Sequence, residues 1–295
     1  MPTEIFSKPP RVASDLAALM SSRGLLIPDM ARAERHIKTV GYYRLMGYGR
    51  HFFDSQNQTF LPGTTYDHIW NAYKFDRKLR LLTLDAIERI EVAVRTAFSN
   101  EMCLAHGAHW FMDSSLFDDP KERNSFCQSL RREFSDGKNE ITKHYFKNYR
   151  LPDLPPAWMA MECISMGTWV RALKSLKQRH QSPIANLFNL PRVSFISWIS
   201  SLAWVRNVCA HHGLLWNRTN MRPPKAPKYQ MNYPNFSNST TTYFATAVVN
   251  YAFLKQIVTR STWVDRLNAL LIEFPTVRIA DMGFPHNWQA HPFWH

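Results

Sequence analysis

The chain has 295 residues, of which 45% are hydrophobic, so it can bury one large core or two modest ones. These values exclude a disordered protein and a disulfide-stapled miniature. Lys and Arg number 36 against 23 Asp and Glu, which gives a formal net charge of +13. So basic a chain favours a polyanionic partner, and a nucleic acid is the simplest one. Charge alone does not distinguish RNA, DNA and membrane phosphate.

The four cysteines are far apart in the sequence and form no C-x-x-C pair, which argues against a zinc ribbon and a redox motif. Their spacing fits a reduced, intracellular setting. The first residues lack an apolar signal-peptide core, and no stretch approaches 18 uninterrupted apolar residues. We therefore expect a cytoplasmic protein without a membrane-spanning segment.

Short helices are expected at the start of the chain. Ser14 or Asp15 can cap a helix that Gly24 would stop, and Pro28 suits the first turn of a second helix. Residues 1–62 are therefore predicted to form a small N-terminal helical region.

Residues 41–50 contain three tyrosines and two arginines within ten residues. One interpretation is an aromatic and basic patch that faces RNA through Tyr43 and Arg44. The other is a packed connector whose tyrosines bury their rings and keep their hydroxyls in water.

The longest helix is predicted from about residue 69 to about residue 104, because apolar residues recur there at intervals of mostly three or four without an intervening Gly or Pro. Asp67 is a candidate cap. This helix should be the centre of an α-helical core.

Two charged pairs at four-residue spacing lie inside this helix, Asp76 with Arg80 and Glu91 with Arg95. The simple interpretation is that both are surface pairs. The alternative is that Glu91 and Arg95 lie near the apolar stripe, face residues 206–212 and orient them.

Further helices are expected in the second half of the chain, and no apolar alternation is long enough to predict a sheet. A loop is expected at 113–122, and Gly167 is expected to interrupt an apolar helix. The predicted helices are about 121–135, 138–148, 158–164, 170–178, a short one between Pro183 and Pro191, one from about Ser194, 241–259 and 262–273.

The helix from about Ser194 carries a buried stripe at helical spacing and leads into Arg206-Asn207-Val208-Cys209-Ala210-His211-His212. Asn207 and His211 are four residues apart and stack on one face, whereas Arg206 and His211 point about 140° apart on an ideal helix. Gly213 suggests that the helix ends here. Either the helix end brings these groups together, or they come from two chains that meet at a two-fold axis.

An arginine and two imidazoles suit metal-free cleavage of RNA. Two imidazoles can remove the proton from the 2′-hydroxyl and protonate the leaving 5′-oxygen, while a guanidinium stabilises charge on the phosphate. DNA lacks the 2′-hydroxyl, so the chemistry requires RNA. The alternative is that this cluster is a structural hydrogen-bond network.

Residues 214–239 form a predicted proline-rich loop beside this cluster. Its cations are candidates for contacts with RNA phosphates, or they belong to a basic surface crossing between helices. These residues are Arg218, Arg222, Lys225 and Lys228.

Other chemistries have weaker support. His106, His109 and Asp113 lack a clear fourth metal ligand, so no metal and no other cofactor is expected. Cys209 beside His211 is more simply a buried helical cysteine than a nucleophile. Nucleotide-binding and serine-hydrolase motifs are missing from the sequence.

The run from Arg206 to His212 resembles the R-x(4 to 6)-H motif of HEPN ribonucleases, in the form with Asn directly after Arg. Other blocks occur in the order found in the Abi-like, AbiD/AbiF type of bacterial abortive-infection proteins. They are Tyr42-Tyr43-Arg44 with Gly47-Tyr48, residues 75–80, residues 90–96, Pro156-Ala157-Trp158 with Glu162 and Gly167, residues 212–218 and Met282-Gly283-Phe284-Pro285.

This resemblance implies an all-α, HEPN-type helical bundle over 63–295, behind the small N-terminal helical region 1–62. It implies a homodimer with paired active sites, metal-independent endoribonuclease activity, and a role in anti-phage defence or toxin-like growth arrest. A bound, structured non-coding RNA is a further implied partner. Arg206 would bind the scissile phosphate, Asn207 would position the cluster, and His211 would transfer protons.

Two questions stay open at this stage. His212 also satisfies the motif spacing, although His211 is preferred because it stacks on Asn207. The alternative function is a non-catalytic RNA-binding protein that holds a structured small RNA, with the motif as a phosphate-binding or structural site.

Overall fold

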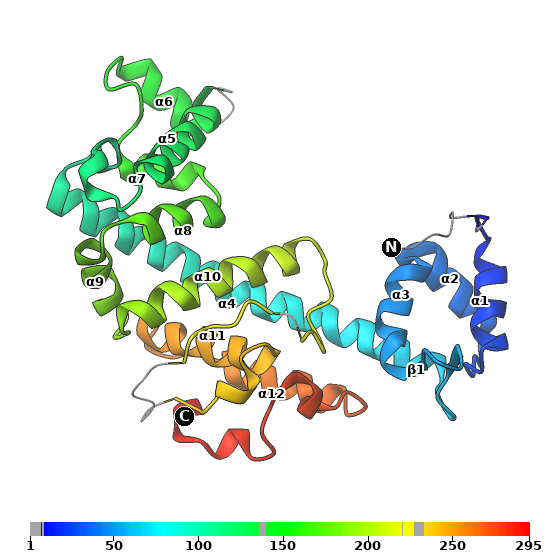
Figure 1. The fold of residues 1–295 in the computed structure, drawn as a ribbon. Coiled ribbons are helices and arrows are strands. Elements are labelled where there is room, and N and C mark those ends of the chain that lie inside the picture. The colour runs from blue at the N-terminus through cyan, green and yellow to red at the C-terminus, as the bar shows by residue number, and fades with distance from the viewer. Residues whose placement is uncertain (1–6, 8, 136–139, 220, 227–232) are drawn as a thin grey trace. The chain divides into compact units, whose positions relative to one another are not determined.

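The computed structural model describes residues 7, 9–135, 140–219, 221–226 and 233–295. These residues form twelve α-helices, several short 3-10 helices and one two-stranded hairpin, so the predicted all-α fold is confirmed (Figure 1). They divide into two compact units. The first contains the chain up to Leu79 together with Ala269–Arg278, and the second contains Arg80–Asn268 together with Ile279–His295. The expected division into 1–62 and 63–295 remains a prediction.

The first unit contains three short α-helices, one 3-10 helix, a hairpin and the start of the long helix α4. The helices are α1 (Ala13–Ser22), α2 (Met30–Val40), α3 (Tyr42–Gly49) and the 3-10 helix η1 (Arg50–Phe52). The hairpin strands β1 (Phe53–Asp54) and β2 (Thr59–Phe60) pair antiparallel with Phe53 opposite Phe60. Strands of two residues are too short to show an apolar alternation, which is why the sequence did not predict them.

Residues 42–49, interpreted from the sequence as either a patch or a connector, form a helix that combines features of both. Tyr48 is 2% exposed, and its hydroxyl donates a hydrogen bond to Asp76 Oδ2 at 2.6 Å. Tyr43, on the same helix, is 81% exposed. The residues alternate between core and surface because the helix is amphipathic.

Helix α4 (Tyr66–His106) begins in the first unit and continues in the second. Most of the residues that the periodicity placed inward are buried, and Ile69, Ile87, Val94 and Phe98 are each 0% exposed. Asp67 lies inside the first turn, where Arg32 donates to its carboxylate. Asp76 and Arg80 are 0% and 5% exposed, so their interpretation as a surface pair was wrong.

The second unit holds the remaining helices (Figure 1). They are α5 (Pro120–Ser135), α6 (Glu140–Asn148), α7 (Ala157–Ala160), α8 (Met166–Ser175), α9 (Gln178–Asn186), α10 (Arg192–Ala210), α11 (Tyr243–Ile257) and the start of α12 (Trp263–Glu273). The short 3-10 helices are η2 (Trp110–Met112), η3 (Ser114–Leu116), η4 (Met161–Cys163), η5 (Ser237–Ser239), η6 (Ile279–Met282), η7 (Trp288–Ala290) and η8 (Pro292–Trp294).

Helix α11 is the most enclosed element, since every residue from Tyr243 to Leu254 is buried. A helix that is buried on all sides belongs at the centre of a core. Thr83 on α4 and Tyr243 share a hydrogen bond of 2.9 Å, and the Trp263 indole donates to the carbonyl of Leu82 at 2.9 Å. These bonds fix α11 and α12 against α4.

Two helix boundaries differ from the prediction. Gly167, expected to interrupt a helix, lies in the first turn of α8, which Ser165 caps by accepting a hydrogen bond from the Thr168 N–H. Pro183, expected to precede a short helix, lies inside α9. Among the described residues, no helix is both long and apolar enough to cross a membrane.

Candidate active site at the end of α10

The end of α10 is closed by a Schellman arrangement of backbone hydrogen bonds. The Gly213 N–H donates to the Val208 carbonyl at 2.8 Å, and the His212 N–H donates to the Cys209 carbonyl at 3.1 Å. The residue in the left-handed conformation is His212, with φ of 56°. The helix therefore ends at Ala210, and His212 takes the left-handed conformation that glycine usually adopts after a helix.

Gly213 is needed for a different reason, which is space. A Cβ atom there would lie 3.1 Å from both Val208 Cγ1 and the Val208 carbonyl oxygen. Contacts this short would require Val208 to shift by a few tenths of an ångström. Gly213 thus permits the close return of the chain, while His212 supplies the turn.

The predicted apolar stripe of α10 is confirmed and fixes the direction of its last turn. Phe195, Trp198, Ile199, Leu202 and Val205 are all 0% exposed. The next residue along the chain, Arg206, is partly exposed because its position has turned away from this stripe.

Arg206 is held beside Glu91 of α4. Its Nε lies 3.9 Å from Glu91 Oε2, and its side chain is 38% exposed against 16% for the glutamate. At this distance the contact is a charge pair rather than a tight hydrogen bond. Burial raises the pKa of Glu91, and the positive charges of Arg206 and Arg95 oppose that rise. Glu91 therefore has a counter-charge while part of the guanidinium still reaches solvent.

Asn207 lies next to Arg206 on the exposed side of the helix. Arg206 Nη1 is 3.5 Å from Asn207 Oδ1, at the outer limit of a hydrogen bond. The Asn207 carbonyl accepts the His211 N–H at 3.0 Å, so the helical backbone hydrogen bonds continue to His211.

Arg95 is directed to a different partner. Its Nη2 lies 2.8 Å from Glu162 Oε2 in η4, and its side chain is 14% exposed. Glu91 therefore meets Arg206 as the sequence suggested, while Arg95 ties α4 to η4. The sequence could not separate these roles because both residues lie on one helix and their partners are distant in the chain.

His211 and His212 are both exposed beyond the last turn. Arg206 lies beside Glu91 and Asn207, and the two histidines follow it past the last turn of α10. The arrangement in which two chains share the site stays a prediction.

Two further arginines surround Gly213. Arg80 donates to the Gly213 carbonyl at 3.3 Å, and Arg218 donates to the Leu214 carbonyl at 3.0 Å. The Arg218 guanidinium also lies 5.1 Å from the centre of the Trp204 ring, a cation–π contact. Arg80 was missed from the sequence because helical spacing paired it with Asp76.

The described part of the proline-rich loop is docked on α10. Ser201 Oγ donates to the Arg222 carbonyl at 2.8 Å, the Lys225 N–H donates to Ser197 Oγ at 2.8 Å, and Trp198 Nε1 donates to the Lys225 carbonyl at 2.7 Å. The side chains of Arg222 and Lys225 are exposed. Lys228 lies outside the described residues.

The other predicted RNA contacts, Tyr43 and Arg44, belong to the first unit and are both exposed there.

The alternative metal site does not assemble. His109 Nε2 bonds the Leu154 carbonyl at 3.0 Å, whereas His106 Nε2 lies 3.1 Å from His180 Nδ1. In the part of the chain that the structure describes, no three His, Cys, Asp or Glu side chains are grouped to hold a metal. Cys209 is a buried thiol that forms no disulfide with any described cysteine, so it packs in the core as expected.

Comparison with known proteins decides the family. The sequence profile described as Abi-like protein matches residues 35–217, more than half of the chain. The chain belongs to the Abi-like family. The matched range includes the end of α10 and the two α4 residues that contact it, Arg80 and Glu91. Membership of this family associates the protein with abortive infection and defence. No curated protein and no solved structure matches the chain.

Proposed function

We propose that this Abi-like protein is a HEPN endoribonuclease that cleaves RNA by attack of the 2′-hydroxyl, and that it acts in anti-phage abortive infection or growth arrest. The observation that carries this proposal is the end of α10, where Arg206 is half-exposed beside Glu91 and is followed by exposed Asn207, His211 and His212. These groups supply the charge and the proton transfers of the reaction.

In this mechanism the Arg206 guanidinium binds the scissile phosphate and stabilises the charge that develops on it. One imidazole removes the 2′-hydroxyl proton, and a second protonates the departing 5′-oxygen. The products are a 2′,3′-cyclic phosphate and a 5′-hydroxyl. Because imidazoles carry both proton transfers, the reaction needs no metal.

Glu91 is a positioning residue in this proposal. Its carboxylate lies 3.9 Å from Arg206 Nε, and the arginine side chain is 38% exposed, so a phosphate can still reach the guanidinium from solvent. Arg80 and Arg218 are placed at Gly213, where they support the turn that presents the histidines.

Dimerisation is part of the proposal, because Arg206 and His211 are five residues apart and point in different directions from the helix. A two-fold axis at the end of α10 would let one protomer supply the arginine and its partner the imidazole. Mixing Arg206→Ala with His211→Ala protein then restores cleavage that neither variant has alone. A mixture as inactive as its components contradicts the shared site.

The proposed activity is tested with purified protein, unpaired RNA and EDTA. We expect cleavage to persist in EDTA and to fall about 100-fold or more in Arg206→Ala and His211→Ala. Folded variants that cut RNA as fast as the wild type would reject the proposal, as would loss of wild-type cleavage in EDTA.

A second candidate function is a non-catalytic protein that holds a structured small RNA. The exposed cations Arg222 and Lys225 on the docked loop and the net charge of +13 favour it. A discrete RNA that copurifies with a protein unable to cut added RNA would support this function over the nuclease.

A further inference from the structure

Helix α6 and the residues after it expose two aromatic rings to solvent. Phe146 is 45% exposed and Tyr149 is 55% exposed. They are three residues apart, and the Tyr149 N–H still donates to the Tyr145 carbonyl at 2.8 Å, so both rings lie on neighbouring turns of one helical segment. Exposed rings at this spacing form a surface on which flat groups can stack.

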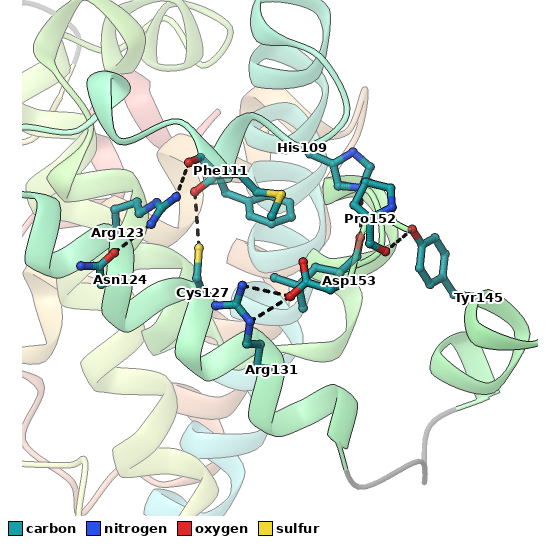
Figure 2. A network of polar contacts seen from close by, with 11 residues as sticks. His109, Phe111, Arg123, Asn124, Cys127, Arg131, Tyr145, Pro152 and Asp153 are labelled. Atoms are coloured by element: carbon teal, nitrogen blue, oxygen red, sulfur yellow. Dashed lines mark hydrogen bonds and ion pairs between the residues drawn. The ribbon is translucent and has the colours of Figure 1, made fainter. Parts of the chain in front are cut away.

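These rings rest on a rigid support. Tyr145 is 4% exposed, and its ring centre lies 5.3 Å from that of Phe146 and 5.3 Å from that of Tyr149. Its hydroxyl donates to the Pro152 carbonyl at 3.0 Å (Figure 2). Because Tyr145 is fixed in this way, the two exposed rings can bind a ligand with little further loss of freedom.

The next residues are tied to α5. Arg131 donates to Asp153 Oδ2 from Nε at 3.1 Å and from Nη2 at 3.0 Å (Figure 2). Arg131 also lines an open groove of about 540 Å³ on α5. The aromatic segment and the groove are therefore joined through one ion pair.

The groove is basic, and its cations are only partly neutralised. Lys121, Arg123 and Arg131 line it together with polar side chains, and none of the described residues that line it is acidic. Arg123 donates to Asn124 Oδ1 at 2.8 Å and to the Met112 carbonyl, both of which are uncharged acceptors. Beside the rings, Lys147 and Arg150 are exposed.

We propose that this surface is a second binding site and that its ligand is unpaired RNA. We call it the α5–α6 surface and define it by Phe146, Tyr149, Lys147, Arg150, Arg123 and Lys121. Bases would stack on the two rings while the cations contact phosphates along the strand. A duplex keeps its bases stacked inside and cannot use the rings. This inference rests on the proposed function only in taking RNA as the ligand.

The test measures binding by the full chain, with Arg206→Ala present throughout so that the RNA stays intact. The probe is a fluorescent, unstructured RNA of about 12 nucleotides, followed by anisotropy. Two further probes are the same RNA annealed to its complement and an oligomer of equal length with phosphates but no bases. They separate the contribution of base stacking to binding from the contribution of phosphate charge.

Removing both rings with Phe146→Ala and Tyr149→Ala should weaken binding of the unpaired RNA about 10-fold or more, because each stacked base contributes substantially. Binding of the base-free oligomer should stay within about twofold. Phe146→Trp with Tyr149→Phe, which keeps two rings, should bind the RNA like the parent. Leu104→Ala, an 86% exposed apolar residue outside the surface, is the matched control.

Replacing the adjacent cations tests how the surface holds phosphates. Lys147→Gln with Arg150→Gln should weaken both single-stranded probes and lower the salt dependence of binding by about 0.7 for each phosphate that is no longer neutralised. The proposal is overturned if the ring-deleted protein binds RNA like the Leu104→Ala control, or if the duplex or the base-free oligomer binds as well as the unpaired RNA.

These outcomes are independent of cleavage. A wild-type chain that does not cut RNA, combined with ring variants that lose RNA binding, would reject the proposed function and keep the α5–α6 surface. Normal RNA binding by the ring variants, combined with cleavage that depends on Arg206, would reject the α5–α6 surface and keep the proposed function.

Discussion

The two ends of α10 differ in what surrounds them. From Phe195 to Val205 the helix carries a stripe of fully buried side chains, whereas from Arg206 onward the polar residues are partly or fully exposed. One helix therefore serves as core at one end and as a candidate active site at the other. Burial of the first part fixes the direction of the second, so a substitution in each part should have a different kind of effect.

The largest effect on stability is expected in the buried part. Trp198→Ala removes a fully buried indole and its hydrogen bond to the Lys225 carbonyl, so we expect a loss of about 3–5 kcal/mol in the free energy of unfolding. Urea denaturation measures this loss. Arg206→Ala should cost about 1–2 kcal/mol, because the contact with Glu91 is loose but its removal takes a counter-charge from a carboxylate that is only 16% exposed. Equal losses in the two variants would remove the distinction between the two ends.

The turn between the parts should respond to Gly213→Ala. The added Cβ would meet Val208 at 3.1 Å from two atoms, so we expect the protein to lose about 1–3 kcal/mol and the histidines to be displaced. Thermal unfolding checks the first effect, and RNA cleavage checks the second. A variant as stable and as active as the wild type would show that the close return of the chain is not required.

His212→Gly should have a smaller effect of opposite sign. Glycine adopts the left-handed conformation of His212 without steric cost, so stability should rise by about 1 kcal/mol. The same variant tests the role of the imidazole, because it leaves the helix end in place. If His211 is the proton-transfer residue, cleavage by His212→Gly should stay within about threefold of wild type. A loss of cleavage activity as large as that caused by His211→Ala would assign proton transfer to both histidines.

The smallest effect is expected from a pair of histidines far from this turn in the sequence. Burial lowers the pKa of His180 below 6.5, and the neighbouring His106, Arg179 and Lys177 add to that shift. As the pH falls below 6.5, the unfolded chain takes up the proton before the folded one does, so stability is lost as the pH falls through the folded pKa.

The check for this effect is the urea midpoint at pH 7.5 and at pH 5.5. His180→Gln should lose less stability over this interval than the wild type does. An identical loss in both proteins would show that His180 does not contribute.

Much of the fold could be predicted from periodicity, and the site only in part. Long apolar repeats gave α4 and α10, because a buried stripe repeats once in every turn. The 3-10 helices and the hairpin at 53–60 are too short to leave such a pattern. The contact of Glu91 with Arg206 and that of Arg95 with Glu162 depend on tertiary packing, which one helix cannot specify.

The sequence predicted that the helix ends near Gly213, but it did not specify which residue takes the left-handed conformation. Glycine is the usual choice there, so Gly213 was the natural candidate. In the structure His212 takes that conformation, and packing against Val208 accounts for the glycine. The sequence therefore predicts that the chain turns here, whereas the packing of the folded chain determines which residue takes the left-handed conformation.

The most direct test of the central claim compares two substrates that differ by one oxygen. An RNA oligonucleotide and the same molecule with a single 2′-deoxy sugar at the mapped cleavage position are incubated with wild-type and Arg206→Ala protein. We predict that the wild type cuts only the RNA and leaves a 2′,3′-cyclic phosphate, and that Arg206→Ala is slower by about 100-fold or more. Cleavage of the deoxy substrate, or an undiminished rate in the variant, would contradict the account.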